Sequence, residues 1–140
     1  HGGAWLCGDY SLADVFFAPV ATRILTYGLP VSDRAMHYAQ AHVRHPAFRR
    51  WRAMGLVEGP HQPFYDMELD RRPFPAPTPL AATAVDLGPA ENDRCPYSGK
   101  PVTHFMDLHG RVFGFCNAFC RDKTVADPVA WPEFMAIYQP

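Results

Sequence analysis

The chain has 140 residues, a length typical of one domain or of one domain with a small module. Hydrophobic residues make up 48% of the sequence and charged residues 19%, close to the globular average, which excludes wholesale disorder. Thirteen basic residues against fourteen acidic ones leave a net charge of −1. This balance argues against a general polyanion binder and makes nucleic acid a disfavoured partner, although a local basic patch is compatible with it.

Nothing in the sequence indicates a membrane-bound or secreted protein. No apolar run approaches the ~20 residues that cross a bilayer, and the first residues lack the layout of a signal peptide. Four cysteines are too few for a disulfide scaffold, and their grouping indicates metal or redox chemistry in a reducing compartment. We therefore expect a cytoplasmic protein with no membrane partner. Because the sequence begins with His1 rather than Met, we expect a processed or trimmed chain, or a fragment of a longer one.

The first predicted helix begins at Ser11. The sequence Ser11-Leu-Ala-Asp14 supplies an N-cap hydroxyl and a carboxylate three residues later, which together make a capping box. Gly28 and Pro30 end the helix. Its apolar residues cover much of its circumference, as is typical of a helix in the middle of a bundle: Leu12, Val15, Phe16, Ala18, Val20, Ile24 and Leu25.

Two shorter helices are predicted next, over residues 32–43 and 45–55. Proline at the first position favours the start of the third helix, which we expect to place Phe48 and Trp51 inward. Four arginines could form a phosphate-binding stripe: Arg44, Arg49, Arg50 and Arg52. A solvated helix face explains them equally well, and the matching acidic total favours that interpretation.

A proline-rich stretch follows the helices. Nine of the fifteen prolines lie between Pro60 and Pro101, which favours extended polyproline geometry and predicts a linker over residues 58–92. The linker also carries a group of apolar side chains, so we expect part of it to pack on a neighbour: Phe64, Tyr65, Met67 and Leu69.

Two motifs in residues 4–56 are similar to a known family. The run Trp5-Leu-Cys-Gly-Asp-Tyr-Ser-Leu-Ala-Asp-Val15 places a glycine turn and an aromatic residue before a Ser-x-Ala-Asp box, and His45-Pro-Ala-Phe-Arg-Arg-Trp51 follows later. This pattern resembles the C-terminal half of the glutathione S-transferase family. In that family the box is a folding element, so the resemblance implies a structural role for Ser11 and Asp14, as the capping pattern does.

The same resemblance implies where catalysis would lie. The family's glutathione site and its activating Ser, Tyr or Cys belong to an N-terminal thioredoxin-like domain, which this sequence does not include. We therefore expect no catalytic residue here, glutathione binding only in a full-length parent, and a parent that could form a homodimer. The missing partners are expected to leave apolar surface exposed around Phe16, Phe17 and Ile24.

The C-terminal segment has the layout of a treble-clef zinc finger. A tight turn at Cys95-Pro-Tyr-Ser-Gly-Lys100 precedes a predicted hairpin over residues 102–115, which turns at Asp107-Leu-His-Gly110. Cys116-Asn-Ala-Phe-Cys120 then places two thiols on one side of the first turn of a helix, where the amide dipoles favour the thiolate form that binds metal. Zinc takes four ligands, and Ser98 stands where a Cys-x-x-Cys turn would have its second cysteine.

Residues 94–138 also resemble the TRASH and YHS metal-binding modules. The matching features are the Cys-x20-Cys-x3-Cys spacing, Phe113-Gly-Phe-Cys116, and Ala126-Asp-Pro128 before a closing helix with Trp and Tyr. This resemblance implies metal binding by Cys95, Cys116 and Cys120. Asn117 departs from it, since many relatives carry a further cysteine there.

The fourth zinc ligand stays open between two histidines of the hairpin, with His104 slightly ahead of His109. A second interpretation is a module that has lost its metal and is held by its aromatic residues. A third is a disulfide between Cys116 and Cys120, which a reducing cytosol disfavours. Cys7 has no basic partner beside it in the sequence, and we interpret it as a small buried residue that fills space.

These observations predict a mainly α chain in three parts: a partial glutathione-transferase-type helical bundle (1–57), the proline-rich linker (58–92) and a small α+β treble-clef module (93–140). The leading hypothesis is the C-terminal fragment of a glutathione S-transferase-like protein that carries a metal-binding module, with zinc as the expected metal. The alternatives are a metal-binding or metal-sensing domain in its own right, and a module for protein or nucleic-acid contact.

Overall fold

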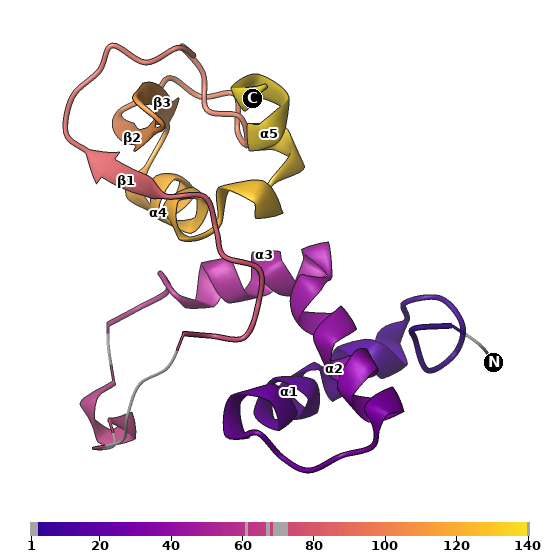
Figure 1. Cartoon of the computed structure of the whole chain (residues 1–140). Helices are drawn as coiled ribbons and strands as arrows, with labels where there is room; N and C mark the ends of the chain where they lie inside the picture. The colour runs from indigo at the N-terminus through magenta and orange to yellow at the C-terminus, as the bar shows by residue number, and fades with distance from the viewer. Residues whose placement is uncertain (1–2, 61, 67, 69–72, 140) are drawn as a thin grey trace. The chain divides into compact units, whose positions relative to one another are not determined.

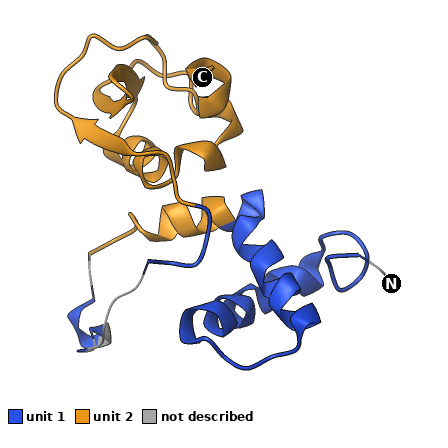
Figure 2. Ribbon diagram, in the orientation of Figure 1, with its two compact units in different colours: residues 1–48, 62–77 blue, residues 49–61, 78–140 orange. Residues whose placement is uncertain are grey.

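The computed structural model describes residues 3–60, 62–66, 68 and 73–139 (Figure 1). Within these residues the chain contains five α-helices and one three-stranded antiparallel sheet, so its fold class is mixed α+β. It divides into two compact units (Figure 2). The first unit comprises residues 1–48 and 62–77, and the second unit comprises residues 49–61 and 78–140.

The three predicted helices are confirmed, with boundaries that differ by a residue or so. They are α1 (Leu12–Tyr27), α2 (Asp33–Arg44) and α3 (Pro46–Gly55). Ser11 is the N-cap of α1, and Gly28 ends α1 with the positive φ of 60° that glycine adopts without strain. A short 3-10 helix, η1 (Pro63–Tyr65), lies in the stretch that we predict to be a linker.

The first unit has a small core, and much of α1 remains uncovered. Ala18 of α1 packs with Val43 and Phe48, and the half-buried Phe74 stacks on Phe48. Phe16, by contrast, is 75% exposed. Phe17 is exposed as well and Ile24 is half-buried, so the expected apolar surface is present. Leu12 and Val20 are exposed too, so the described residues do not enclose α1 as the middle helix of a bundle would be enclosed.

The sheet of the second unit consists of β1 (Ala82–Val85), β2 (His104–Leu108) and β3 (Arg111–Phe115), in that order. The predicted hairpin is β2–β3, and its two turn residues, His109 and Gly110, both have positive φ, as a type I′ turn requires. The strand β1 lies within the stretch predicted to be a linker. It can pair with β2 because residues 80–88 contain no proline and keep every amide donor.

The core of the second unit lies between one face of the hairpin and the C-terminal helices α4 (Ala118–Ala126) and α5 (Pro132–Tyr138). Alternate strand residues supply the buried side chains of the sheet: Met106, Leu108, Phe113 and Phe115. Phe134 and Tyr138 of α5 pack on them, and a short 3-10 helix, η2 (Pro128–Ala130), joins α4 to α5.

The later residues of α3 belong to the second unit. Ala53 is buried in its core, and the Arg49 guanidinium donates two hydrogen bonds to the Asp127 carboxylate, at 2.8 Å and 2.6 Å. Trp51, which we expected to face inward, is 58% exposed. Phe48 is buried as expected, but the prediction for Trp51 is wrong because Ala53, the α3 residue in the core of the second unit, lies about 200° around the helix from it. Among the described residues, no helix is both long and apolar enough to cross a membrane.

Candidate metal centre

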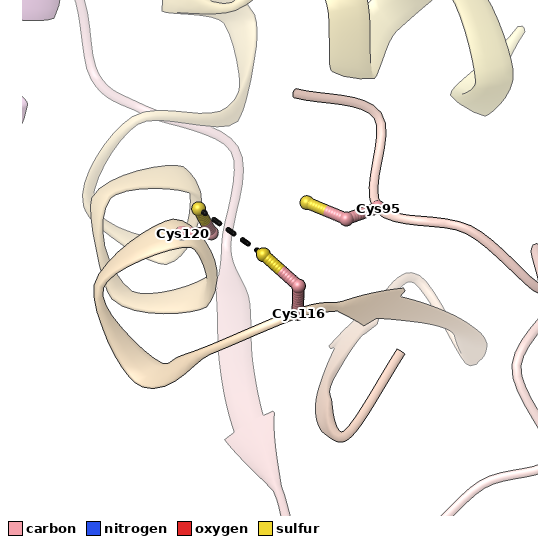
Figure 3. Close-up of side chains that lie close together, drawn as sticks. All are labelled: Cys95, Cys116 and Cys120. Atoms are coloured by element: carbon pink, nitrogen blue, oxygen red, sulfur yellow. Dashed lines mark hydrogen bonds between the residues drawn. The ribbon is translucent and has the colours of Figure 1, made fainter. Parts of the chain in front are cut away.

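Three separate elements of the second unit bring three thiols together. Cys95 opens a tight turn, Cys116 follows the last residue of β3, and Cys120 lies in the first turn of α4. Their sulfur atoms all lie within 4.8 Å of one another, and Figure 3 shows the three side chains converging. All three are free thiols, so the disulfide interpretation is not what the structure shows. We refer to Cys95, Cys116 and Cys120 as the thiol cluster.

The spacing of the thiol cluster fits a metal ion. A tetrahedral zinc with sulfur ligands at ~2.3 Å holds its sulfur atoms ~3.8 Å apart. The Cys116 and Cys120 sulfurs are 4.0 Å apart, with Cys95 buried beside them. A small contraction of the cluster therefore brings all three sulfurs to bonding distance, and the group could hold a metal ion such as zinc.

Local backbone geometry fixes each thiol. In the turn, the Gly99 amide donates to the Cys95 carbonyl and the Cys95 amide donates to the Lys100 carbonyl, both at 2.9 Å. Gly99 has a φ of 68°, which a residue with a side chain rarely adopts. Asn117 is the N-cap of α4, and its side-chain oxygen accepts from the Cys120 amide at 2.7 Å, which holds Cys120 in the first turn.

The surroundings of the cluster favour negative charge on one thiol but not on all of them. Burial raises the pKa of Cys95, but hydrogen bonds from the backbone amides of Cys116, Tyr97 and Ser98 outweigh it and lower this pKa to about 7. Burial and the neighbouring Cys95 raise the pKa of Cys120 to about 11. A cation among the three sulfurs would offset this repulsion, so the donor set suits a metal ion better than an empty trithiolate.

A lysine places a positive charge beside the cluster. The Lys123 ammonium lies 3.8 Å from the centre of the Tyr97 ring and 4.0 Å from that of Trp131. Two aromatic faces at these distances hold the ammonium in position. Its positive charge opposes the rise in the pKa of the Cys120 thiol.

The two histidines considered as fourth ligands do not join the thiol cluster. The Nδ1 atom of His104 lies 2.9 Å from the hydroxyl oxygen of its neighbour Thr103. That of His109 lies 2.8 Å from the Tyr138 hydroxyl at the tip of the hairpin. Among the described residues, the group within 4.8 Å consists of the three cysteines alone. Cys7 is exposed in the first unit, so its interpretation as a buried filler is wrong.

Ser11 and Asp14 lie in the first unit, where the Asp14 carboxylate is fully buried. It accepts hydrogen bonds from the amides of Leu6 and Ser11 and from the hydroxyls of Ser11 and Tyr38, at 2.9–3.1 Å. Burial raises the pKa of this carboxyl, but the hydrogen bonds together lower it below its usual value. The arrangement ties the start of α1 to α2 and to the preceding loop.

Sequence reasoning missed two residues that act around the cluster. The signal for Asn117 as a helix cap was present, since asparagine before a helix is a favoured N-cap. Lys123 comes three residues after Cys120, and this spacing predicts that the two residues share one face of the helix. The spacing does not predict the contact of Lys123 with Tyr97 and Trp131, because those side chains come from other elements.

No protein-family model, no curated protein and no solved structure matches this chain. What the site can bind is therefore inferred from its geometry and its donor atoms. The thiol cluster could bind one metal ion. Its three thiols are free, backbone amides donate to Cys95, and the ammonium of Lys123 lies nearby.

Proposed function

We propose that residues 93–140 form a metal-binding module in which Cys95, Cys116 and Cys120 hold a zinc ion. The convergence of their three sulfurs, from a turn, a strand end and a helix start, within 4.8 Å is the observation that carries this proposal. The order of turn, hairpin and helix supports a module of the treble-clef kind, similar to the TRASH and YHS modules.

Each protein group has a defined task in this proposal. The metal supplies a cross-link among elements that are distant in sequence and favours the deprotonated thiols. Amides around Cys95 and the Ser98 hydroxyl, which donates to the Cys116 sulfur at 3.1 Å, spread the negative charge. Lys123 contributes a compensating charge near Cys120. The result is a cluster prepared for one divalent ion.

Elemental analysis of the purified chain tests the proposal. We expect one zinc per chain, its loss in Cys95→Ser, and its retention in Cys7→Ser, since Cys7 lies outside the thiol cluster. A metal-free chain that fails to take up added zinc, together with a Cys95→Ser variant of unchanged stability, would contradict it.

We further propose that residues 4–56 are part of the helical domain of a glutathione S-transferase-like protein. The buried Asp14 carboxylate, held by Ser11 and by Tyr38 of α2, supports this because it gives the Ser-x-Ala-Asp box the structural role that the family's box has. In this proposal glutathione binds elsewhere in a longer parent, and this chain does not catalyse conjugation. Appreciable turnover of a general electrophile with glutathione by the 140-residue chain would contradict it.

A further inference from the structure

The thiol cluster has three protein ligands, whereas zinc in proteins takes four. Within the part of the chain that the structure describes, no histidine, aspartate, glutamate or further cysteine joins the three sulfurs in a group of this size. If the cluster binds metal as proposed above, the chain leaves one coordination position for another ligand.

The Ser98 hydroxyl contacts the thiol cluster directly. Ser98 belongs to the same turn as Cys95, and its hydroxyl donates a hydrogen bond to the Cys116 sulfur at 3.1 Å while accepting one from the Lys100 amide at 3.3 Å. A neutral hydroxyl that donates to a thiolate supports a ligand but does not act as one. Cysteine at this position would close the site.

The rim of the cluster is open and polar. Ser98 and Asn117 are exposed, and Cys116 and Cys120 are only half-buried. The Asn117 amide nitrogen lies 3.5 Å from the Cys116 sulfur as a second donor. This side of the cluster is therefore accessible from solvent.

Three thiolates form a soft donor set, which favours sulfur as the remaining ligand. The donors of Ser98 and Asn117 and the ammonium of Lys123 moderate the negative charge that a fourth thiolate would add. We propose that the fourth coordination position is exchangeable and takes a small thiol from solution, and that Ser98 keeps this position open. On binding, the thiol would lose its proton to the buffer, its sulfur would donate a lone pair to the metal, and a water molecule held at that position would leave for the solvent, so no oxidant or reductant is needed.

Cobalt substitution tests this inference in the full chain. The Cys7→Ser variant is loaded with Co²⁺ and titrated with 2-mercaptoethanol, so that the remaining cysteine of the chain cannot supply the ligand. We expect a saturable rise of about one third in the sulfur-to-cobalt absorption, as the donor set goes from three thiolates to four. Ser98→Cys in the same background is expected to show the larger absorption from the start and no response to the thiol. Ser98→Ala is expected to keep the response but to need more thiol to saturate it, because the position stays open while one donor to the Cys116 sulfur is lost.

The outcomes separate this inference from the proposed function. Failure to bind Co²⁺ or zinc at all would overturn both. Metal binding with no response to 2-mercaptoethanol, a response to imidazole alone, or a four-sulfur spectrum before any thiol is added would overturn the exchangeable thiol position and leave the metal site standing.

Discussion

At the scale of single residues, Asp14 shows how one carboxylate organises a helix start. It is fully buried, and two backbone amides and two hydroxyls donate hydrogen bonds to it. Hydrogen bonds to a charged group are stronger than neutral ones, and breaking them leaves buried donors without a partner. The structural role of the Ser-x-Ala-Asp box therefore follows from this contact set as well as from the capping pattern.

We expect Asp14→Asn to destabilise the first unit by about 3 kcal/mol at neutral pH, because the amide cannot accept all of these bonds. The carboxyl has a lowered pKa in the folded chain, so its contribution is present above its unfolded pKa and is lost as pH falls through the folded one. The difference between wild type and variant should therefore shrink on acidification. Hydrogen exchange of the α1 amides measures this difference in stability, with Asp33→Asn as the control because Asp33 is exposed. Equal protection of both variants at neutral pH would contradict the role of Asp14.

At the scale of elements, the approach of the cysteine turn to β3 depends on Gly114. A Cβ atom at this position would lie 2.6 Å from the Val102 Cβ and 2.7–2.8 Å from its methyl groups. The Asn92 side chain also donates to the Gly114 carbonyl and accepts from its amide, both at 2.8 Å, as a neighbouring strand would. Close packing here sets the start of the hairpin against its end, next to Cys116.

Gly114→Ala is accordingly expected to destabilise the second unit by about 2 kcal/mol, since the Val102 side chain and β3 must move apart to make room for the new methyl group. Adding Val102→Ala should recover part of the loss because it removes the contacting methyl groups. Gly55→Ala is the matched control, since a Cβ there meets nothing within 4 Å. Hydrogen exchange of the β2 and β3 amides reports the effect, and a loss of equal size in Gly55→Ala would refute the steric explanation.

These elements differ in how far the sequence predicts them. Helices α1 to α3 were predictable because caps such as Ser11 and Gly28 are local signals, and the hairpin because its turn chemistry is local too. The strand β1 was not predicted, since the prolines around it favour a linker and its pairing is decided by β2. The inward direction assigned to Trp51 and the ligand role considered for His104 both depend on which neighbours a face meets, and hydrophobic spacing alone does not contain that information.

At the scale of the whole molecule, Arg49 joins α3 to the C-terminal part of the second unit. Its ion pair with Asp127 is bidentate, with both side chains largely buried, at 16% and 9% exposure. Such a pair stabilises the folded state little more than apolar residues of equal size would, but removing one partner leaves an unpaired buried charge, which destabilises it. The inclusion of residues 49–61 in the second unit has this physical basis, together with the burial of Ala53.

Arg49→Met is expected to cost the second unit about 3 kcal/mol, because the largely buried Asp127 carboxylate loses its bidentate partner. The double variant with Asp127→Asn should be more stable than Arg49→Met alone, since it removes the unpaired charge. Hydrogen exchange of the α4 amides measures the stability of the single and the double variant. Equal stability of the single and double variants would show that the ion pair does not hold α3 to this unit.

The two units have separate clusters of buried side chains, so metal binding should act on one and leave the other unchanged. At a free zinc concentration of 100 times Kd, a ligand that binds only the folded state adds about 2.7 kcal/mol, which corresponds to ~100-fold slower exchange through global unfolding. We expect this slowing in β3, which Cys116 directly follows, and in α4, which contains Cys120, and none in α1 and α2. Cys95→Ser should abolish it. Mass-spectrometric hydrogen exchange of the full chain with and without zinc provides the measurement. Equal protection of α1 would mean that the units unfold together, and the metal would then stabilise the whole molecule rather than the module that binds it.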